Sequence, residues 1–174
     1  MPTTLKPLYG VSFNLTQTLA SLASDTSLLA GRSSAVVDNT SSLYADVLLS
    51  GFVSTGTSPT TAKQIEFWAW AIVDDGPTFP DAITGSDAAV TMTTLDIKAA
   101  CMKCIGIVPT DNTSNRKYDM PPTTLVTLFG AMPKKWVIFV VHNTAVALNA
   151  TGSNHQITGT PINLTPGRDH WWHD

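Results

Sequence analysis

Short alternating or fully apolar runs recur along this sequence of 174 residues, and turn-forming residues separate them. Three runs, at residues 43–50, 64–73 and 136–143, have the length of strands and are rich in β-branched and aromatic side chains. Thr, Ser, Asn, Gly and Pro fill the intervening stretches, and strong helix signals are almost absent. The pattern predicts an all-β fold, a jelly-roll-like β-sandwich of two sheets with about eight strands.

Two of these runs predict central strands, covered on both faces. Residues 136–141 are nearly all apolar, and residues 64–73 put an apolar set on each side of the strand. The two sets are Ile65, Phe67, Ala69, Ala71 and Val73 on one side, and Glu66, Trp68, Trp70 and Ile72 on the other.

Other segments predict the remaining strands. Residues 33–37, 43–52, 122–129 and 155–164 are expected to be strands, with Leu43, Ala45, Val47 and Leu49 on one face of the second. Residues 97–108 suit either a strand or a helix, and residues 15–29 suit a strand followed by a turn at least as well as a helix. We predict one β-sandwich domain over residues 1–164 and an extended C-terminal tail over residues 165–174.

Charge and composition exclude two classes of partner. Only 13% of the residues are charged, against about 25% in an ordinary soluble protein, and the net charge is −3. Nucleic acid is not an expected partner, because phosphate binding requires clustered Lys and Arg. No apolar run approaches the roughly 20 residues that span a bilayer, so we expect no membrane partner. The first six residues do not resemble a signal peptide, so we expect no secretion.

Cysteine and histidine residues are too few to predict a metal site. Cys101 and Cys104 have the spacing of a zinc or redox pair, but no second pair accompanies them. We interpret them as reduced, buried thiols. His142 and His155 fall on separate predicted strands, and no close His-x-His pair precedes the single glutamate, Glu66. We predict no catalytic residue, no metal site and no cofactor, and interpret both histidines as hydrogen-bonded structural residues.

Aromatic and acidic residues leave a ligand-binding alternative open. Trp68 and Trp70 share a predicted strand face, and with Trp136 they could form a platform on which sugar rings stack; the other interpretation is that they belong to the core. Four aspartates could supply oxygen ligands to Ca²⁺, but their spacing matches no calcium loop, so we interpret them as turn residues. They are Asp74, Asp75, Asp81 and Asp87.

The C-terminal segment is the least ordinary part of the sequence. Trp171 and Trp172 are adjacent, and each indole offers roughly 200 Å² of surface that is favourable to bury. We expect this tail to dock on its own domain or on a neighbouring subunit, since Trp is enriched at binding hot spots. Arg168 and His170 lie beside the pair. These four residues are the candidate partner-binding residues.

Three stretches resemble a family of small virion structural proteins of tailed double-stranded DNA bacteriophages. Residues 20–59 read ASLASDTSLLAGRSSAVVDNTSSLYADVLLSGFVSTGTSP, and residues 65–91 hold the aromatic strand and then DDGPTFPDAITGSDAAVT. Residues 135–159 read KWVIFVVHNTAVALNATGSNHQITG. These are strand and turn patterns, with no catalytic signature among them. Residues 160–174 lie beyond the resemblance, and the Cys101 and Cys104 pair is atypical of it.

The resemblance implies a β-sandwich that serves as a capsid decoration or cement protein. Such a protein would be made in the host cytoplasm and would bind the major capsid protein on the outside of the shell. A homo-oligomer is expected, and a trimer would match the threefold positions of an icosahedral lattice. The alternative is a carbohydrate-binding or adhesion module on a head fibre or tail, using Trp68, Trp70 and the loop aspartates.

Overall fold

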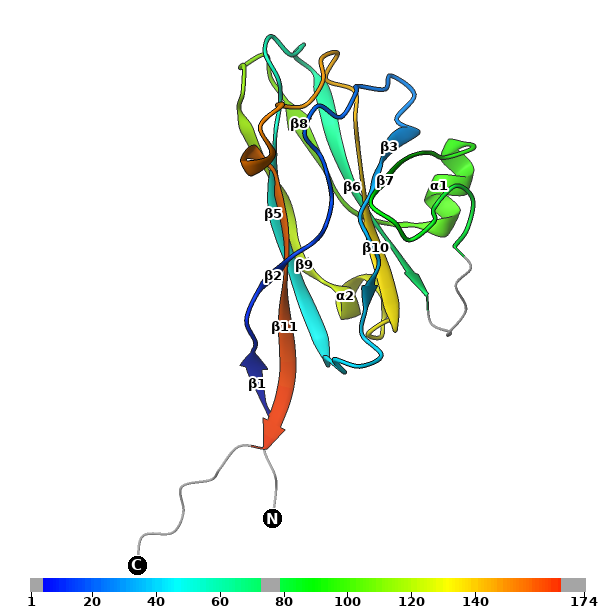
Figure 1. Cartoon of the computed structure of the whole chain (residues 1–174), viewed down its shortest axis with the longest axis vertical. Helices are drawn as coiled ribbons and strands as arrows, with labels where there is room; N and C mark the ends of the chain where they lie inside the picture. The colour runs from blue at the N-terminus through cyan, green and yellow to red at the C-terminus, as the bar shows by residue number, and fades with distance from the viewer. Residues whose placement is uncertain (1–4, 73–78, 167–174) are drawn as a thin grey trace, which may run out of the picture.

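The computed structural model describes residues 5–72 and 79–166, which form two antiparallel sheets packed face to face (Figure 1). Sheet A holds β1 (Leu5–Tyr9), β2 (Phe13–Asn14), β5 (Asp46–Ser54), β9 (Lys117–Thr124) and β11 (Gln156–Pro166). Sheet B holds β3 (Ala30–Ser33), β4 (Val37–Asp38), β6 (Lys63–Ile72), β7 (Ala88–Thr91), β8 (Lys103–Thr110) and β10 (Lys135–His142). Two short α-helices, α1 (Leu95–Cys101) and α2 (Leu125–Phe129), and a 3₁₀ turn, η1 (Gly152–Asn154), complete this part of the chain.

The strand order is that of a jelly roll. In sheet A, β11 pairs with β2 and with β5, and β5 pairs with β9; in sheet B the order is β3-β10-β6-β8. Successive strands mostly alternate between the sheets, so neighbours within a sheet are distant in sequence. These eight strands confirm the predicted all-β, two-sheet fold. The strands β1 and β7 extend sheets A and B at their edges, and β4 is a short addition beside β10.

The main core lies between the two sheets. Trp136, Phe67 and Leu49 are fully buried there, and burial of each such side chain contributes about 1.5–3 kcal/mol. Leu125 of α2 is also fully buried in this core. The helix lies at the lower end of the sandwich in Figure 1.

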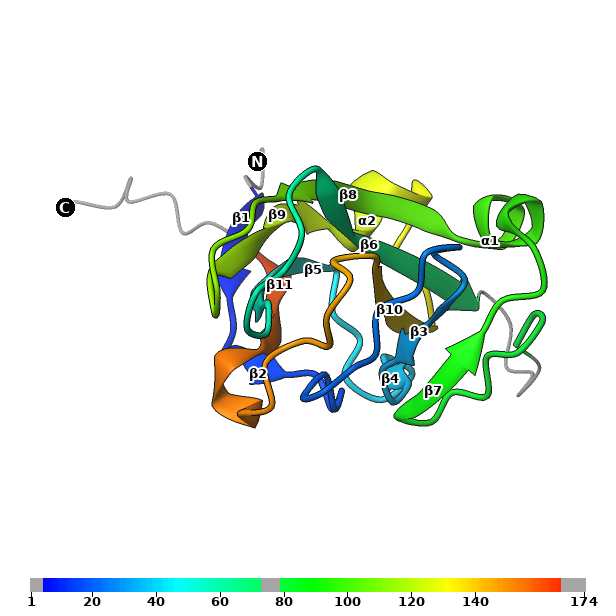
Figure 2. The same cartoon turned by 90° about the horizontal axis from the view of Figure 1, so that it is seen from above.

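A second core covers the outer face of sheet B. Val137, Phe139 and Val141 of β10 point away from the main core and are fully buried under residues 79–102, which carry β7 and α1. Figure 2 shows α1 on the side of sheet B that faces away from sheet A, and β7 at the edge of sheet B beside β3. The predictions that 64–73 and 136–141 are central strands, covered on both faces, are therefore confirmed for the described residues.

Two predicted segments differ because short helices interrupt them. Residues 97–108 divide into the end of α1 and most of β8, and 122–129 divide into the end of β9 and α2. The Thr124 hydroxyl accepts a hydrogen bond from the Thr127 N–H at 3.3 Å, and Gly130 ends α2 with a φ of 79°. The prediction of one strand over 122–129 was wrong because these caps, and not apolar content, decide so short a segment.

Other strand predictions were wrong in position. Residues 15–29 form no strand; they are an irregular segment in which the Asp25 carboxylate accepts hydrogen bonds from three backbone N–H groups. Residues 33–37 cover the break between β3 and β4. The strand predicted from 43 begins at Asp46 and the one predicted over 155–164 runs to Pro166, two residues past the predicted domain boundary. Among the described residues, no helix is long and apolar enough to cross a membrane.

Candidate interaction surface

The strand β1 and the end of β11 project from the sandwich as a two-stranded arm (Figure 1). The pairing of β11 with β5 ends at Ile162, opposite Asp46, and residues 163–166 continue in register with β1 alone. All five residues of β1 are exposed. The arm is therefore a ribbon of two strands that no other described element covers.

One face of the arm is apolar and uncharged. Side chains alternate along each strand, so those of Leu5, Pro7 and Tyr9 share a face with those of Ile162 and Leu164 on the paired strand. We call these five residues the apolar arm face. The opposite face carries Lys6, Leu8, Asn163 and Thr165.

The outer edge of the arm is blocked for strand pairing. The Gly10 N–H donates to the Pro161 carbonyl at 2.9 Å, which fixes the alternation of hydrogen bonds between β1 and β11. In that alternation the backbone groups of Leu5, Pro7 and Tyr9 point away from β11, and Pro7 has no N–H to donate. A further strand could not complete a hydrogen-bonded ladder on this edge.

Exposed apolar side chains are concentrated at the arm end of the molecule. Eight large hydrophobic residues of the described chain are exposed, and six of them lie on the arm, beside it or on the neighbouring β4–β5 connection. The six are Leu5, Leu8, Tyr9, Val11, Leu43 and Leu164; the other two are Leu95 and Ile107. Single exposed hydrophobic residues are ordinary, but a cluster marks an interaction surface.

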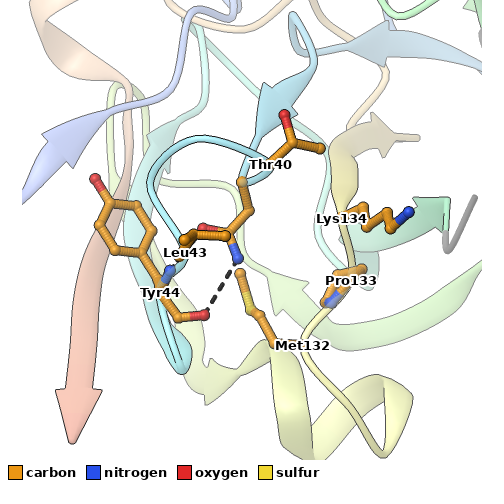
Figure 3. A pocket seen from close by; sticks show the side chains of 7 residues that line it. Thr40, Leu43, Tyr44, Met132, Pro133 and Lys134 are labelled. Atoms are coloured by element: carbon orange, nitrogen blue, oxygen red, sulfur yellow. Dashed lines mark hydrogen bonds between the residues drawn. The ribbon is translucent and has the colours of Figure 1, made fainter. Parts of the chain in front are cut away.

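An open cavity of about 410 Å³ lies near the base of the arm, between the β4–β5 connection and the segment before β10 (Figure 3). The Asn39 side chain holds the connection: its Oδ1 accepts from the Tyr44 N–H at 2.8 Å, and its Nδ2 donates to the Tyr44 carbonyl at 3.2 Å. Leu43 has a φ of 51°, a left-handed conformation that leucine rarely adopts, and is 75% exposed. The prediction that Leu43 belongs to the strand was wrong, because β5 begins only at Asp46. The lining residues are Asn39, Thr40, Leu43, Tyr44, Met132, Pro133 and Lys134.

The three tryptophans of the predicted sugar platform do not share a surface. Trp136 is fully buried between the sheets, whereas Trp68 and Trp70 lie on the outer face of sheet B. There Lys98 of α1 lies over the Trp68 ring, 4.9 Å from its centroid, and Phe79 packs on Trp70 at 4.9 Å between ring centroids. The platform interpretation is wrong, and the core interpretation is confirmed.

The only glutamate forms a buried ion pair beneath α1. Glu66 Oε2 lies 2.8 Å from Lys98 Nζ, and the two side chains are 6% and 3% exposed. The indole N–H of Trp68 donates to the same oxygen at 2.8 Å, and the Gln64 amide donates to the other at 2.6 Å. Lys98 also donates to the Leu28 carbonyl at 2.6 Å. Every charged atom has a partner, so this network holds α1 on the sheet.

His142 and His155 are buried and half-buried, respectively, and both are hydrogen-bonded. His142 lies 2.9 Å from the Thr144 hydroxyl and 3.1 Å from the Leu22 carbonyl, and burial holds its pKa below the ordinary value. His155 Nδ1 accepts from the Ser54 N–H, and burial lowers its pKa as well. The interpretation of both as structural residues is confirmed.

The cysteines and aspartates form no metal site in the described chain, where no group of three or more candidate ligands occurs. Cys101 is half-buried and Cys104 is exposed, so the prediction of two buried thiols was wrong for Cys104, which lies on the edge strand β8. Asp81 accepts two hydrogen bonds from Thr93, and Asp87 accepts from Thr18 and Arg32. Asp74 and Asp75 lie outside the described residues.

The candidate partner-binding residues Arg168, His170, Trp171 and Trp172 also lie outside the described residues. The arm that precedes them was not predicted as an interaction surface. Its sequence signal is the alternation of Leu5, Pro7 and Tyr9, which a strand assignment would have placed on one face.

No family model, curated protein or solved structure matches this chain. The sequence resemblance and the exposed apolar side chains at the arm end are the observations that bear on function.

Proposed function

We propose that the chain is a virion structural protein of a tailed bacteriophage, a decoration or cement protein that binds the major capsid protein on the outside of the shell. The observation that carries this proposal is the concentration of exposed apolar side chains at one end of a sandwich. A protein that coats another surface needs one adhesive end and a body that does not attract further partners.

The arm end has the chemistry of such an adhesive surface. The arm and the Leu43 connection together present six large apolar side chains, and fully burying each contributes up to about 1.5–3 kcal/mol before ordering is subtracted. Leu43 is held outward in a left-handed conformation and is 75% exposed, so its side chain is available for contact.

The body of the sandwich is weakly interacting. Along the outer face of sheet A, Gln156 and Thr158 hydrogen-bond to the Asn14 side chain at 2.8 and 3.2 Å, so their polar groups are already paired. The outer face of sheet B is covered by residues 79–102. A body of this kind stays soluble while its apolar end binds.

The proposed mechanism is mechanical. Copies that bridge neighbouring capsid subunits stabilise the closed shell by mass action, because they bind the closed shell better than separated subunits. Repetition over the lattice lets a weak single contact act with high avidity. A homotrimer at the threefold positions is the arrangement we propose.

The test is binding of the purified protein to capsids that lack it, measured by co-sedimentation and by copy number per particle. We expect stoichiometric binding that falls at least tenfold in Leu43→Ser and is unchanged in Ile107→Thr, an exposed apolar position on β8 away from the arm end. A chain truncated after Thr165 tests the contribution of Trp171 and Trp172. Absence of binding, or a handful of copies per particle, would contradict the proposal.

A further inference from the structure

We propose that the apolar arm face binds the same face on a second copy of this chain, so that the protein self-associates through its arms. A face that binds itself joins copies in pairs, so this contact would link copies of neighbouring trimers and would not form the trimer itself. It uses some of the apolar residues of the proposed capsid-binding end, and it is tested without capsids.

The arm needs a cover that the described chain does not supply. Leu5, Tyr9 and Leu164 are 58%, 60% and 56% exposed, and they lie on one face of a ribbon of only two strands. An isolated two-stranded ribbon is marginally stable at best in water, and it becomes stable when another layer covers its apolar face. The same ribbon on a second copy is such a layer.

The contact is expected through the face of the ribbon and not through its edge. The outer edge is blocked because Pro7 offers no N–H at a position where a third strand would need one. Sheets that pack face to face interdigitate side chains across about 10 Å, and the apolar arm face offers such side chains on both strands.

The absence of charge on this face suits contact with itself. In a symmetric contact between copies, a charged side chain would meet its own like charge, which is unfavourable. The described arm has one charged side chain, Lys6, and it lies on the opposite face. The nearest charge on the same side is Asp46 of β5, opposite Ile162, and its Oδ1 accepts hydrogen bonds from the Val47 and Val126 N–H groups. The face itself is aliphatic apart from Tyr9, so an equally apolar copy of the same face complements it.

The contact is expected to be weak. Five partly exposed side chains on each of two copies bury on the order of 600 Å² in total, below the roughly 1,000 Å² of a stable interface. Association should therefore depend on concentration in solution. On an ordered lattice, the high local concentration of arms would strengthen it.

The experiment is sedimentation velocity of the full chain from about 10 µM to about 1 mM. We expect the wild-type mass to rise from 18.6 kDa towards a multiple of that value. Leu164→Asp and Leu5→Ser should remain monomeric throughout. Leu8→Ser is the matched control, because Leu8 is 55% exposed on the same strand but on the opposite face, and it should associate like the wild type. Far-ultraviolet circular dichroism checks that each variant is folded.

Two results overturn this proposal. A wild-type chain that stays monomeric over the whole range means that the cover is either the chain's own residues 167–174 or the shell protein, which truncation after Pro166 and capsid binding then separate. A Leu8→Ser variant that dissociates as fully as Leu5→Ser means that association does not depend on the apolar arm face in particular.

Discussion

Two apolar sheet faces in this molecule differ in whether other described residues cover them. On the outer face of sheet B, residues 79–102 fold over Val137, Phe139 and Val141 and bury them. On the arm, no described residue covers the apolar face of Leu5, Tyr9 and Leu164. The comparison shows that apolar alternation on a strand does not by itself determine whether the same chain covers that face.

The largest loss of stability is expected from removing the ion pair that holds α1 on the outer face of sheet B. Glu66→Ala leaves the Lys98 ammonium buried without its carboxylate, and removal of one partner of a buried pair destabilises a protein by about 3–5 kcal/mol. Urea unfolding measures the change. Leu164→Thr on the uncovered arm is the control and should alter stability by less than about 0.5 kcal/mol. Equal effects at the two sites would remove the distinction between the faces.

Shortening a buried side chain of the second core should cause the next largest loss of stability. Met92 is 1% exposed in the cover of sheet B, and Met→Ala at such a site costs about 2–5 kcal/mol through lost burial and the cavity left behind. Met92→Ala should also expose Trp68 and Trp70 and shift their fluorescence to longer wavelength. A loss below about 1 kcal/mol would mean that the cover is loosely packed.

Lowering the pH should reduce the free energy of unfolding of the sandwich and leave the contact between arm faces unchanged. His142 and His155 have pKa values lowered by burial from the ordinary 6.5, so the unfolded chain binds protons first as the pH falls. Stability is complete above about pH 6.5 and declines below it, by at most about 1.4 kcal/mol per pH unit for each histidine. Urea midpoints from pH 8 to pH 5 measure this decline. The apolar arm face has no carboxylate, histidine or amine, so self-association should not follow it.

The smallest effect is expected at the base of the arm. Leu43→Gly relieves a left-handed leucine and should stabilise the fold by about 0.5–1 kcal/mol, since the strain it removes slightly exceeds the backbone entropy that glycine adds. Thermal unfolding measures the gain, and capsid binding should fall because the exposed side chain is lost. A stabilised variant that still binds fully would show that Leu43 is not part of the adhesive end.

The sequence predicted the central strands well because the period-two pattern in residues 64–73 and 136–141 is strong. It did not separate α2 from β9, because the caps at Thr124 and Gly130 outweigh the strand-like composition of so short a segment. It placed Leu43 on a strand face with Val47 and Leu49, since alternation alone does not reveal that the strand begins only at Asp46.

The arm was not predicted from the sequence, for a different reason. Pro7 argues against a strand, and the five residues of β1 have no local partner. Their partner is β11, and the pairing that joins Leu5 to Pro166 spans 161 positions of sequence. The sequence instead indicated Trp171 and Trp172 as partner-binding residues, because two adjacent indoles offer a large apolar surface.

That long span has a consequence for biosynthesis. The first strand leaves the ribosome early but cannot pair until β11 has been synthesised, so the arm is among the last parts of the chain to form. The chain therefore gains its apolar arm face only when translation has passed residue 166, and a shorter copy has no such face.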